Sequence, residues 1–139
     1  RLTMYTPSNI TPVESIEAEL ITYQDYLQQE YRSDLGADVV DRIDTLSQYM
    51  ARSGKLKADA EWHYNKLVDS EIMKCLADLV HEKLAISTVN KLIEAKAKDY
   101  KYLVAWSDRV NRSCVHSLDC LRSILSSLKQ EASFFKGHH

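Results

Sequence analysis

The chain has 139 residues, with 18 basic and 20 acidic side chains and a formal net charge of -2. Its length fits one domain of roughly 100–200 residues, and the near balance of charge excludes a protein that coats nucleic acid by bulk positive charge alone. Only three Gly and two Pro are present. So few turn-forming residues favour a small number of long helices.

The cysteines Cys75, Cys114 and Cys120 form no C-x-x-C pair, so the sequence predicts neither a disulfide framework nor a zinc site and favours a reducing, cytoplasmic setting. No apolar run approaches the ~18–20 residues of a membrane span, and the first residues lack the apolar core of a signal peptide. We therefore expect a soluble protein with no membrane partner. The last residues, 137–139, are interpreted as the remnant of a purification tag.

The N-terminal part of the chain predicts an arm followed by a helix. Residues 1–10 are rich in Thr, Ser, Asn and Pro, which is typical of an extended arm, and residues 11–136 are expected to form a single helical domain. The first helix is predicted to start after Thr11 and Pro12. The Thr11 side chain can cap free amides, Pro12 is favourable in a first turn, and the Glu14 side chain can accept a hydrogen bond from the backbone at the start of the helix. It is predicted to end near Tyr31.

Two further helices are predicted from apolar residues three and four positions apart. The second follows a turn at residues 33–36 and covers residues 39–52, where Ser53 and Gly54 can turn the chain. The third covers residues 56–79, about 40 Å, and its apolar stripe drifts slowly around the helix, which indicates that its neighbour changes along its length. A break is expected between His81 and Ile86.

The last predicted helix is the longest, because residues 87–131 contain neither Gly nor Pro. It would span about 65 Å, more than the width of a compact domain of this size. Its apolar residues cover an arc of roughly 120–140°, wide enough for more than one partner helix. The sequence thus predicts an all-α fold, a long helical hairpin or antiparallel bundle with coiled-coil-like packing, extended by self-association into a homo-oligomer. The arc consists of Leu92, Ile93, Tyr100, Leu103, Val104, Val110, Cys114, Leu118, Leu121, Leu125 and Leu128.

The opposite side of the same helix carries cations and aromatic rings. Single-stranded nucleic acid needs both, because Lys and Arg contact phosphates and flat rings stack on bases. The alternative is an ordinary solvated helix face, since Asp108 and Asp119 share this side and can pair with neighbouring cations. We call this side the basic face: Lys91, Lys98, Lys101, Arg109, Arg112 and His116, with Tyr102 among them and Trp106 at its border.

A second cluster of cations surrounds the predicted turn at Gly54, namely Arg52, Lys55 and Lys57. A turn would present these side chains freely for a nucleic-acid contact. An exposed Trp62 nearby would indicate an interface, with protein or with nucleic acid. Catalytic motifs are missing, as there is no Gly-rich phosphate loop, G-x-S-x-G or paired metal-ligand set. We therefore expect no enzyme, no metal and no cofactor.

Two stretches carry a resemblance to a known family. Leu46-Ser47-Gln48-Tyr49-Met50 is followed by Lys55-Leu56-Lys57, and Leu92-Ile93-Glu94-Ala95-Lys96 leads into Tyr100, Leu103, Leu118 and Arg122. In this order they resemble the recombination mediators of T-even-type phages, the UvsY family, over about two thirds of the chain. The resemblance implies an oligomer without catalytic residues that binds single-stranded DNA and helps load a recombinase onto strands covered by single-strand-binding protein. It also implies that Lys55 and Lys57 contribute to DNA binding.

The sequence therefore favours a non-enzymatic, oligomeric single-stranded-DNA-binding accessory protein of the recombination mediator type, in the cytoplasm of a bacterial host if a phage encodes it. The alternative is a helical protein-protein adaptor or assembly factor that does not bind nucleic acid. The two differ in whether the protein binds an oligonucleotide in a salt-dependent way. The candidate nucleic-acid-binding residues are Lys55, Lys57, Lys91, Lys98, Lys101, Tyr102, Arg109 and Arg112.

Overall fold

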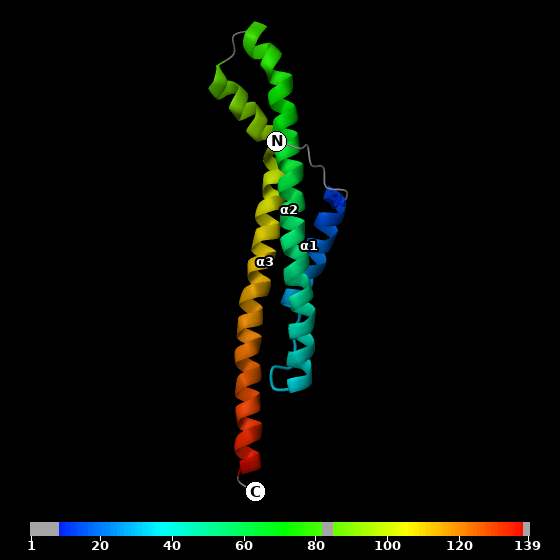
Figure 1. Ribbon diagram of the computed structural model, residues 1–139, viewed down its shortest axis with the longest axis vertical. Coiled ribbons are helices and arrows are strands. Elements are labelled where there is room, and N and C mark those ends of the chain that lie inside the picture. The colour runs from blue at the N-terminus through cyan, green and yellow to red at the C-terminus, as the bar shows by residue number, and fades with distance from the viewer. Residues whose placement is uncertain (1–8, 82–84, 138–139) are drawn as a thin grey trace, which may run out of the picture.

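The computed structural model describes residues 9–81 and 85–137, and in these parts of the chain all regular structure is helical. The three helices are α1 (Val13–Gln28), α2 (Gly36–His81) and α3 (Ile86–Gly137). With 46 and 52 residues, α2 and α3 are about 70 Å and 80 Å long. They run antiparallel as a long hairpin, and α1 lies against its middle (Figure 1). The predicted all-α class is confirmed.

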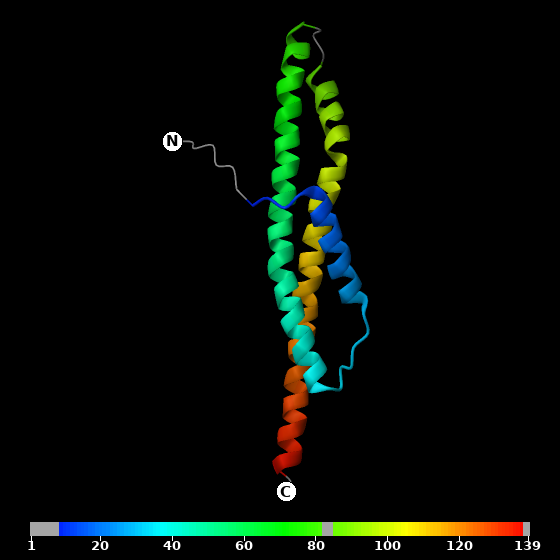
Figure 2. The ribbon, with the colours of Figure 1, turned by 90° about the vertical axis from the view of Figure 1, so that its right-hand side faces the viewer.

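The short helix α1 packs against both long helices. In Figure 2, α1 lies along the hairpin at the level where α2 and α3 are side by side, and it contacts both of them. The C-terminal end of α3 projects beyond the start of α2 in both views. The middle of the molecule is therefore a three-helix bundle, whereas both ends of the rod have fewer helices.

The hydrophobic core lies in this three-helix segment. Leu46 and Leu56 of α2, Leu118 of α3, and Ile16 and Leu20 of α1 are all fully buried and belong to one core cluster. Burial of such a side chain contributes roughly 1.5–3 kcal/mol to the stability of the fold. The spacing of apolar residues therefore predicts well which side of each helix faces the core. The remaining members of the core are Tyr23, Val39, Ala60, Leu103, Val110, Cys114 and Leu121.

The predicted turn at Ser53 and Gly54 is wrong, because α2 is one continuous helix from Gly36 to His81. Ser53 is fully buried, and its hydroxyl donates a hydrogen bond to the carbonyl of Met50. Asn111 of α3 donates to that same carbonyl at 2.8 Å and to the Ser53 hydroxyl at 3.1 Å. A glycine inside a helix costs about 1 kcal/mol, and the packing on either side of Gly54 outweighs that cost.

α1 starts directly after Thr11 and Pro12, as predicted, but the predicted cap at this end is wrong. Pro12 precedes the first helical residue, and no side chain caps this end. Thr11 does not cap α1, because its backbone N–H and its hydroxyl both donate to the Asp59 carboxylate of α2, at 2.9 and 2.7 Å. The helix ends at Gln28 and not near Tyr31. A contact between distant parts of the chain has thus replaced the local one.

The far end of α1 is capped from another helix. The guanidinium of Arg42, on α2, donates to the carbonyls of Tyr26 at 3.0 Å and Leu27 at 3.2 Å. The last carbonyls of a helix have no partner within the helix, so Arg42 supplies one. Arg42 itself is 6% exposed and stacks over the rings of Tyr26 and Tyr31. Both ends of α1 are therefore fixed to α2 by polar contacts.

The ends of the rod carry exposed apolar side chains. Near the hairpin tip, Met73 is 69% exposed and Leu92, which was expected in the apolar arc, is 52% exposed. In Figure 1 the first turns of α3 lean away from α2 before the helices come together, which explains this exposure. At the other end, Phe134 and Phe135 are exposed. Within the described ranges, no helix is apolar over enough of its length to cross a membrane.

Some expectations fall on residues outside the described ranges. These are most of the predicted N-terminal arm, at residues 1–8, the centre of the expected break, at residues 82–84, and the final residues 138–139. Asn9 and Ile10 precede α1 without helical structure, and Gly137 is the last residue of α3.

Candidate nucleic-acid interface

A groove of about 820 Å³ lies between α1 and α3, in the middle of the rod. It lies beside the C-terminal end of α1, and three of its α3 lining residues are small, namely Ala105, Ser113 and Ser117. We call this space the α1–α3 groove. Its α1 wall consists of Gln24, Leu27 and Gln28, and α3 supplies Trp106, Asp108, Arg109, Val110, Arg112 and His116.

The aromatic part of the groove is held in place by α1. The indole N–H of Trp106 donates to Oε1 of Gln24 at 2.9 Å, which fixes the orientation of a half-buried ring. One turn earlier on α3, the ring of Tyr102 is 68% exposed, and its centroid lies 6.2 Å from that of Trp106. The two rings together form an aromatic surface at one end of the groove.

The cations of the groove follow on the next turns of α3. Arg109 is exposed and makes no ion pair with any described residue. Arg112 pairs with Asp108 at 3.0 Å, but its side chain is 80% exposed. Asp108 also pairs with Lys57 of α2 at 3.1 Å, and Lys57 lies 4.0 Å from Glu61 as well, so the charges of Arg112 and Lys57 are balanced by two carboxylates and Arg109 is the cation on these turns without an acidic partner among the described residues. The structure therefore brings Arg109, Arg112 and the aromatic pair into one site.

Three lysines extend the basic face toward the hairpin tip. Lys91, Lys98 and Lys101 are exposed, and none of them is paired with a residue that the structure describes. From Lys91 to Arg112 the cations cover 21 helical steps, about 32 Å along α3. The structure thus places five of the predicted residues and Tyr102 on one long surface. Their role as nucleic-acid contacts stays a prediction.

Lys55 and Lys57 lie differently from the expectation. Because α2 has no turn at Gly54, these side chains project from a helix and are half-buried. Lys55 forms an ion pair with Asp59, four residues along α2, and donates to the carbonyl of Asn9 at 3.3 Å. Lys57 pairs with Asp108 of α3. Much of their charge is therefore neutralised within the protein.

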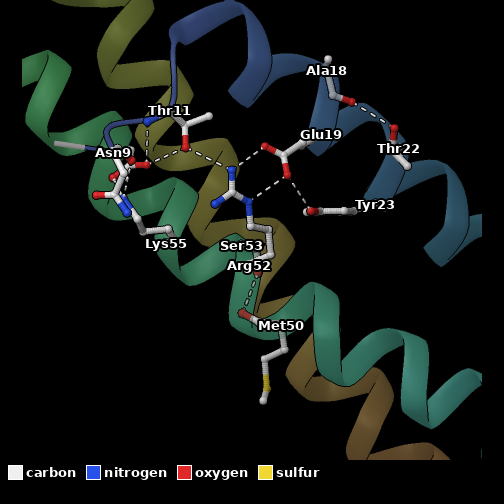
Figure 3. A network of polar contacts seen from close by, with 11 residues as sticks. Asn9, Thr11, Ala18, Glu19, Thr22, Tyr23, Met50, Arg52, Ser53 and Lys55 are labelled. Carbon is white, nitrogen blue, oxygen red and sulfur yellow. Dashed lines mark hydrogen bonds and ion pairs between the residues drawn. The ribbon is translucent and has the colours of Figure 1, made fainter. Parts of the chain in front are cut away.

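A polar network attaches the start of α1, the end away from the groove, to α2 (Figure 3). Arg52 makes two hydrogen bonds to the Glu19 carboxylate, at 2.8 and 2.9 Å, and a third to the Thr11 hydroxyl. Thr11 in turn donates to Asp59, and Lys55 pairs with Asp59 from the other side. We call these five residues the N-terminal clasp. It fixes α1, and with it one wall of the groove.

The electrostatics of the clasp favour its charged forms. Burial raises the pKa of the Asp59 carboxyl, but hydrogen bonds from Lys55 and Thr11 outweigh burial and hold the pKa below its ordinary value. Hydrogen bonds from Arg52 lower the pKa of Glu19. Burial, together with its hydrogen bond to Glu19, raises the pKa of Tyr23 to about 12. At neutral pH both carboxylates are therefore ionised and paired.

His63 adds a further contact to the same end of α1. Its Nε2 lies 2.8 Å from the carbonyl oxygen of Thr11. A carbonyl can only accept, so Nε2 carries the proton and donates. This bond ties the residue before Pro12 to α2 a second time, beside the contact of Thr11 with Asp59. Among the described residues, no group of three or more His, Cys, Asp or Glu side chains could hold a metal ion.

Two parts of this site were missed in the sequence. Gln24 has no special spacing or motif, and its contact with Trp106 joins residues 82 positions apart. Asp59 reads as an ordinary helical acid, although it is only 1% exposed. The one feature of the sequence that could have indicated a groove was the small size of Ala105, Ser113 and Ser117 on a long helix.

Compared with protein-family models, with curated proteins and with solved structures, the chain has no match.

Proposed function

We propose that this protein is a non-enzymatic, oligomeric accessory protein that binds single-stranded DNA, of the recombination mediator type that assists recombinase loading. The observation that carries the proposal is the α1–α3 groove, which Arg109, Arg112 and Trp106 line together, with the ring of Tyr102 6.2 Å from that of Trp106. The resemblance of the chain to phage recombination mediators supports the same function. Recombinase and single-strand-binding protein are then its expected partners, in the cytoplasm of a bacterial host.

The chemistry of the surface suits a single strand better than a duplex. Cations along a helix can follow a phosphate backbone, and exposed rings can stack on bases that are not paired. In a duplex the base faces are stacked on one another, so a ring beside the backbone has nothing to stack on. Lys91, Lys98 and Lys101 would continue the backbone contacts toward the hairpin tip.

Self-association belongs to the proposal, because one chain offers few uncommitted cations. The C-terminal end of α3 projects beyond α2 (Figure 1), and exposed Phe135 lies on this end. Several linked copies would bind one strand with an effective affinity well above that of a single copy. Light scattering should return a mass of at least twice the 16.0 kDa of one chain. A particle of 16.0 kDa at micromolar concentration would contradict this part of the proposal.

The direct test is fluorescence anisotropy of a labelled single-stranded oligonucleotide, titrated with the protein at several salt concentrations. We expect binding at low salt that weakens as salt is added. Replacing Lys98 and Lys101 with Gln should weaken binding without changing the helical circular dichroism. Lys129→Gln is the matched control, since Lys129 is also exposed on α3 but lies near its far end. The absence of binding at the lowest salt would overturn the proposal.

The second candidate function is a helical protein-protein adaptor, and the hairpin tip favours it. Ile72, Met73, Leu76 and Val80 of α2 are between 43% and 74% exposed, and contiguous exposed apolar side chains often mark protein contacts. This function predicts indifference to DNA. A complex with a partner protein that survives nuclease treatment, in a protein that gives no anisotropy change with the oligonucleotide, would favour the adaptor.

A further inference from the structure

We infer that the α1–α3 groove contacts the bases of the strand and not only its phosphates, with Trp106 as the stacking ring and α1 as the wall that completes the site. The inference rests on the proposed function, because it names what the groove would recognise in single-stranded DNA. It separates the basic face into two parts. Lysines near the tip contact backbone alone, whereas the groove contacts unpaired bases.

Trp106 is held in one position before any strand binds. Its indole N–H is bonded to Gln24, and one side of the residue packs against the hydrophobic core. A ring fixed in this way loses little side-chain freedom on binding, so the gain from stacking is not offset by ordering. Tyr102, exposed one turn away, offers a second ring to a neighbouring base. Stacking of this kind is independent of base identity, because every base has a π face.

α1 supplies hydrogen-bonding groups to the groove. The indole N–H can only donate, so the bond from Trp106 fixes the amide of Gln24 with its oxygen toward the ring. The amide N–H groups of Gln24 then have no partner among the described residues. Gln28, one turn along α1, is exposed and also lines the groove. Two glutamine amides on one wall can bond to base edges, as Gln does to adenine.

The groove is large enough to take the bases of a strand. Its volume of about 820 Å³ lies within the roughly 300–1,000 Å³ of sites that bind small organic ligands. Its lining includes buried Val110 and half-buried Leu27 and Ser117, against which a flat group can pack between α1 and α3. Arg109 and Arg112 lie on the α3 side of this space, where they can contact the phosphates that connect the inserted bases.

The site is incomplete without α1. No other helix supplies Gln24, and α1 is fixed by the N-terminal clasp at one end and by Arg42 at the other. Loss of the clasp should therefore weaken base contacts while leaving the lysines of α3 in place. Gln24→Ala tests this wall directly. Its matched control is Asp25→Ala, which changes the next exposed residue of α1, outside the groove lining.

Tryptophan fluorescence of the full chain distinguishes base contact from backbone contact. The protein has two tryptophans, so Trp62→Phe leaves Trp106 as the only reporter. We expect oligothymidylate to quench Trp106 with the same midpoint as the anisotropy of the labelled strand. In the reverse variant, Trp106→Phe, the emission of Trp62 should stay unchanged during the titration. Circular dichroism melting shows that each variant is folded before it is titrated.

An abasic oligonucleotide of the same length supplies the critical comparison, because it has the phosphates and lacks the bases. We expect it to bind about tenfold or more weakly and to leave Trp106 unquenched. Gln24→Ala should reduce this preference for the strand with bases, and Asp25→Ala should keep it. Equal affinity for both strands, or binding without quenching of Trp106, would overturn the inference and leave the proposed function standing. No anisotropy change with either strand would overturn both.

Discussion

Replacing Asp59 with Asn should lower the free energy of unfolding by about 2 kcal/mol, although the two side chains have nearly the same shape. The carboxylate is 1% exposed and accepts hydrogen bonds from the N–H and the hydroxyl of Thr11 and from Lys55. Asparagine keeps one acceptor oxygen for Thr11 and loses the negative charge that faces Lys55. The start of α1 should therefore become less firmly attached to α2.

The magnitude follows from the bonds that change. A hydrogen bond to a charged group contributes about 1.5–3 kcal/mol and a neutral one about 1 kcal/mol. Neutralising Asp59 weakens the two bonds from Thr11 by roughly 0.5 kcal/mol each. The ion pair with Lys55 is lost, and because the Lys55 side chain is 35% exposed, solvent limits that loss to about 1 kcal/mol. The sum is about 2 kcal/mol, or roughly 8 °C in Tm for a chain of this length.

Urea unfolding followed by circular dichroism measures this change, with Asp25→Asn as the control at an exposed position of α1. We expect a lower midpoint and an unchanged m value for Asp59→Asn only. The pKa of Asp59 is held below its ordinary value, so its contribution is present above about pH 4 and is lost as the pH falls through the lowered pKa. The difference from wild type should shrink in acid. Equal midpoints for both variants at pH 7 would refute the reasoning.

Three further predictions concern the helices themselves. Gly54→Ala should stabilise the protein by about 0.5–1 kcal/mol in urea unfolding, because the added methyl meets only Nδ2 of Asn111 at 3.7 Å; a loss of stability would indicate a turn. Leu118→Ala should cost about 3 kcal/mol, whereas Val115→Ala, at an exposed position of α3, should cost well under 1 kcal/mol. Burial raises the pKa of Cys114 to about 11, so Cys114→Ala should leave the number of thiols that react rapidly with a disulfide reagent at pH 8 unchanged. A drop in that number would contradict the burial.

The helical class and the core were predictable because they depend on local spacing. Leu46, Leu56 and Leu118 follow helical intervals, and all three are fully buried. The break expected at Gly54 was wrong for a physical reason. A glycine signals a turn only when packing does not oppose it, and here Asn111 of α3 bonds to the carbonyl of Met50 across the interface. That contact joins residues 61 positions apart, beyond the reach of any local pattern.

The candidate site was predictable in part. Helical projection places Arg109, Arg112 and Tyr102 on one side of α3, and the structure keeps them there. The groove itself was not predictable, because it requires α1 to lie beside α3, and the position of α1 depends on the contact of Thr11 with Asp59. A threonine before a proline predicts a helix cap from the local sequence alone. Thr11 instead donates its hydrogen bonds to Asp59 of α2, because a buried carboxylate needs hydrogen-bond donors.

The measurement that tests the central claim most directly is the salt dependence of binding to a single-stranded oligonucleotide, compared between wild type and Arg109→Gln. We predict that the logarithm of the affinity falls linearly with the logarithm of salt concentration, and that Arg109→Gln makes this slope shallower by about 0.7 for one lost phosphate contact. The control Lys129→Gln should keep the wild-type slope. Affinity that does not depend on salt, or the same slope in wild type and Arg109→Gln, would contradict a strand bound along the α1–α3 groove.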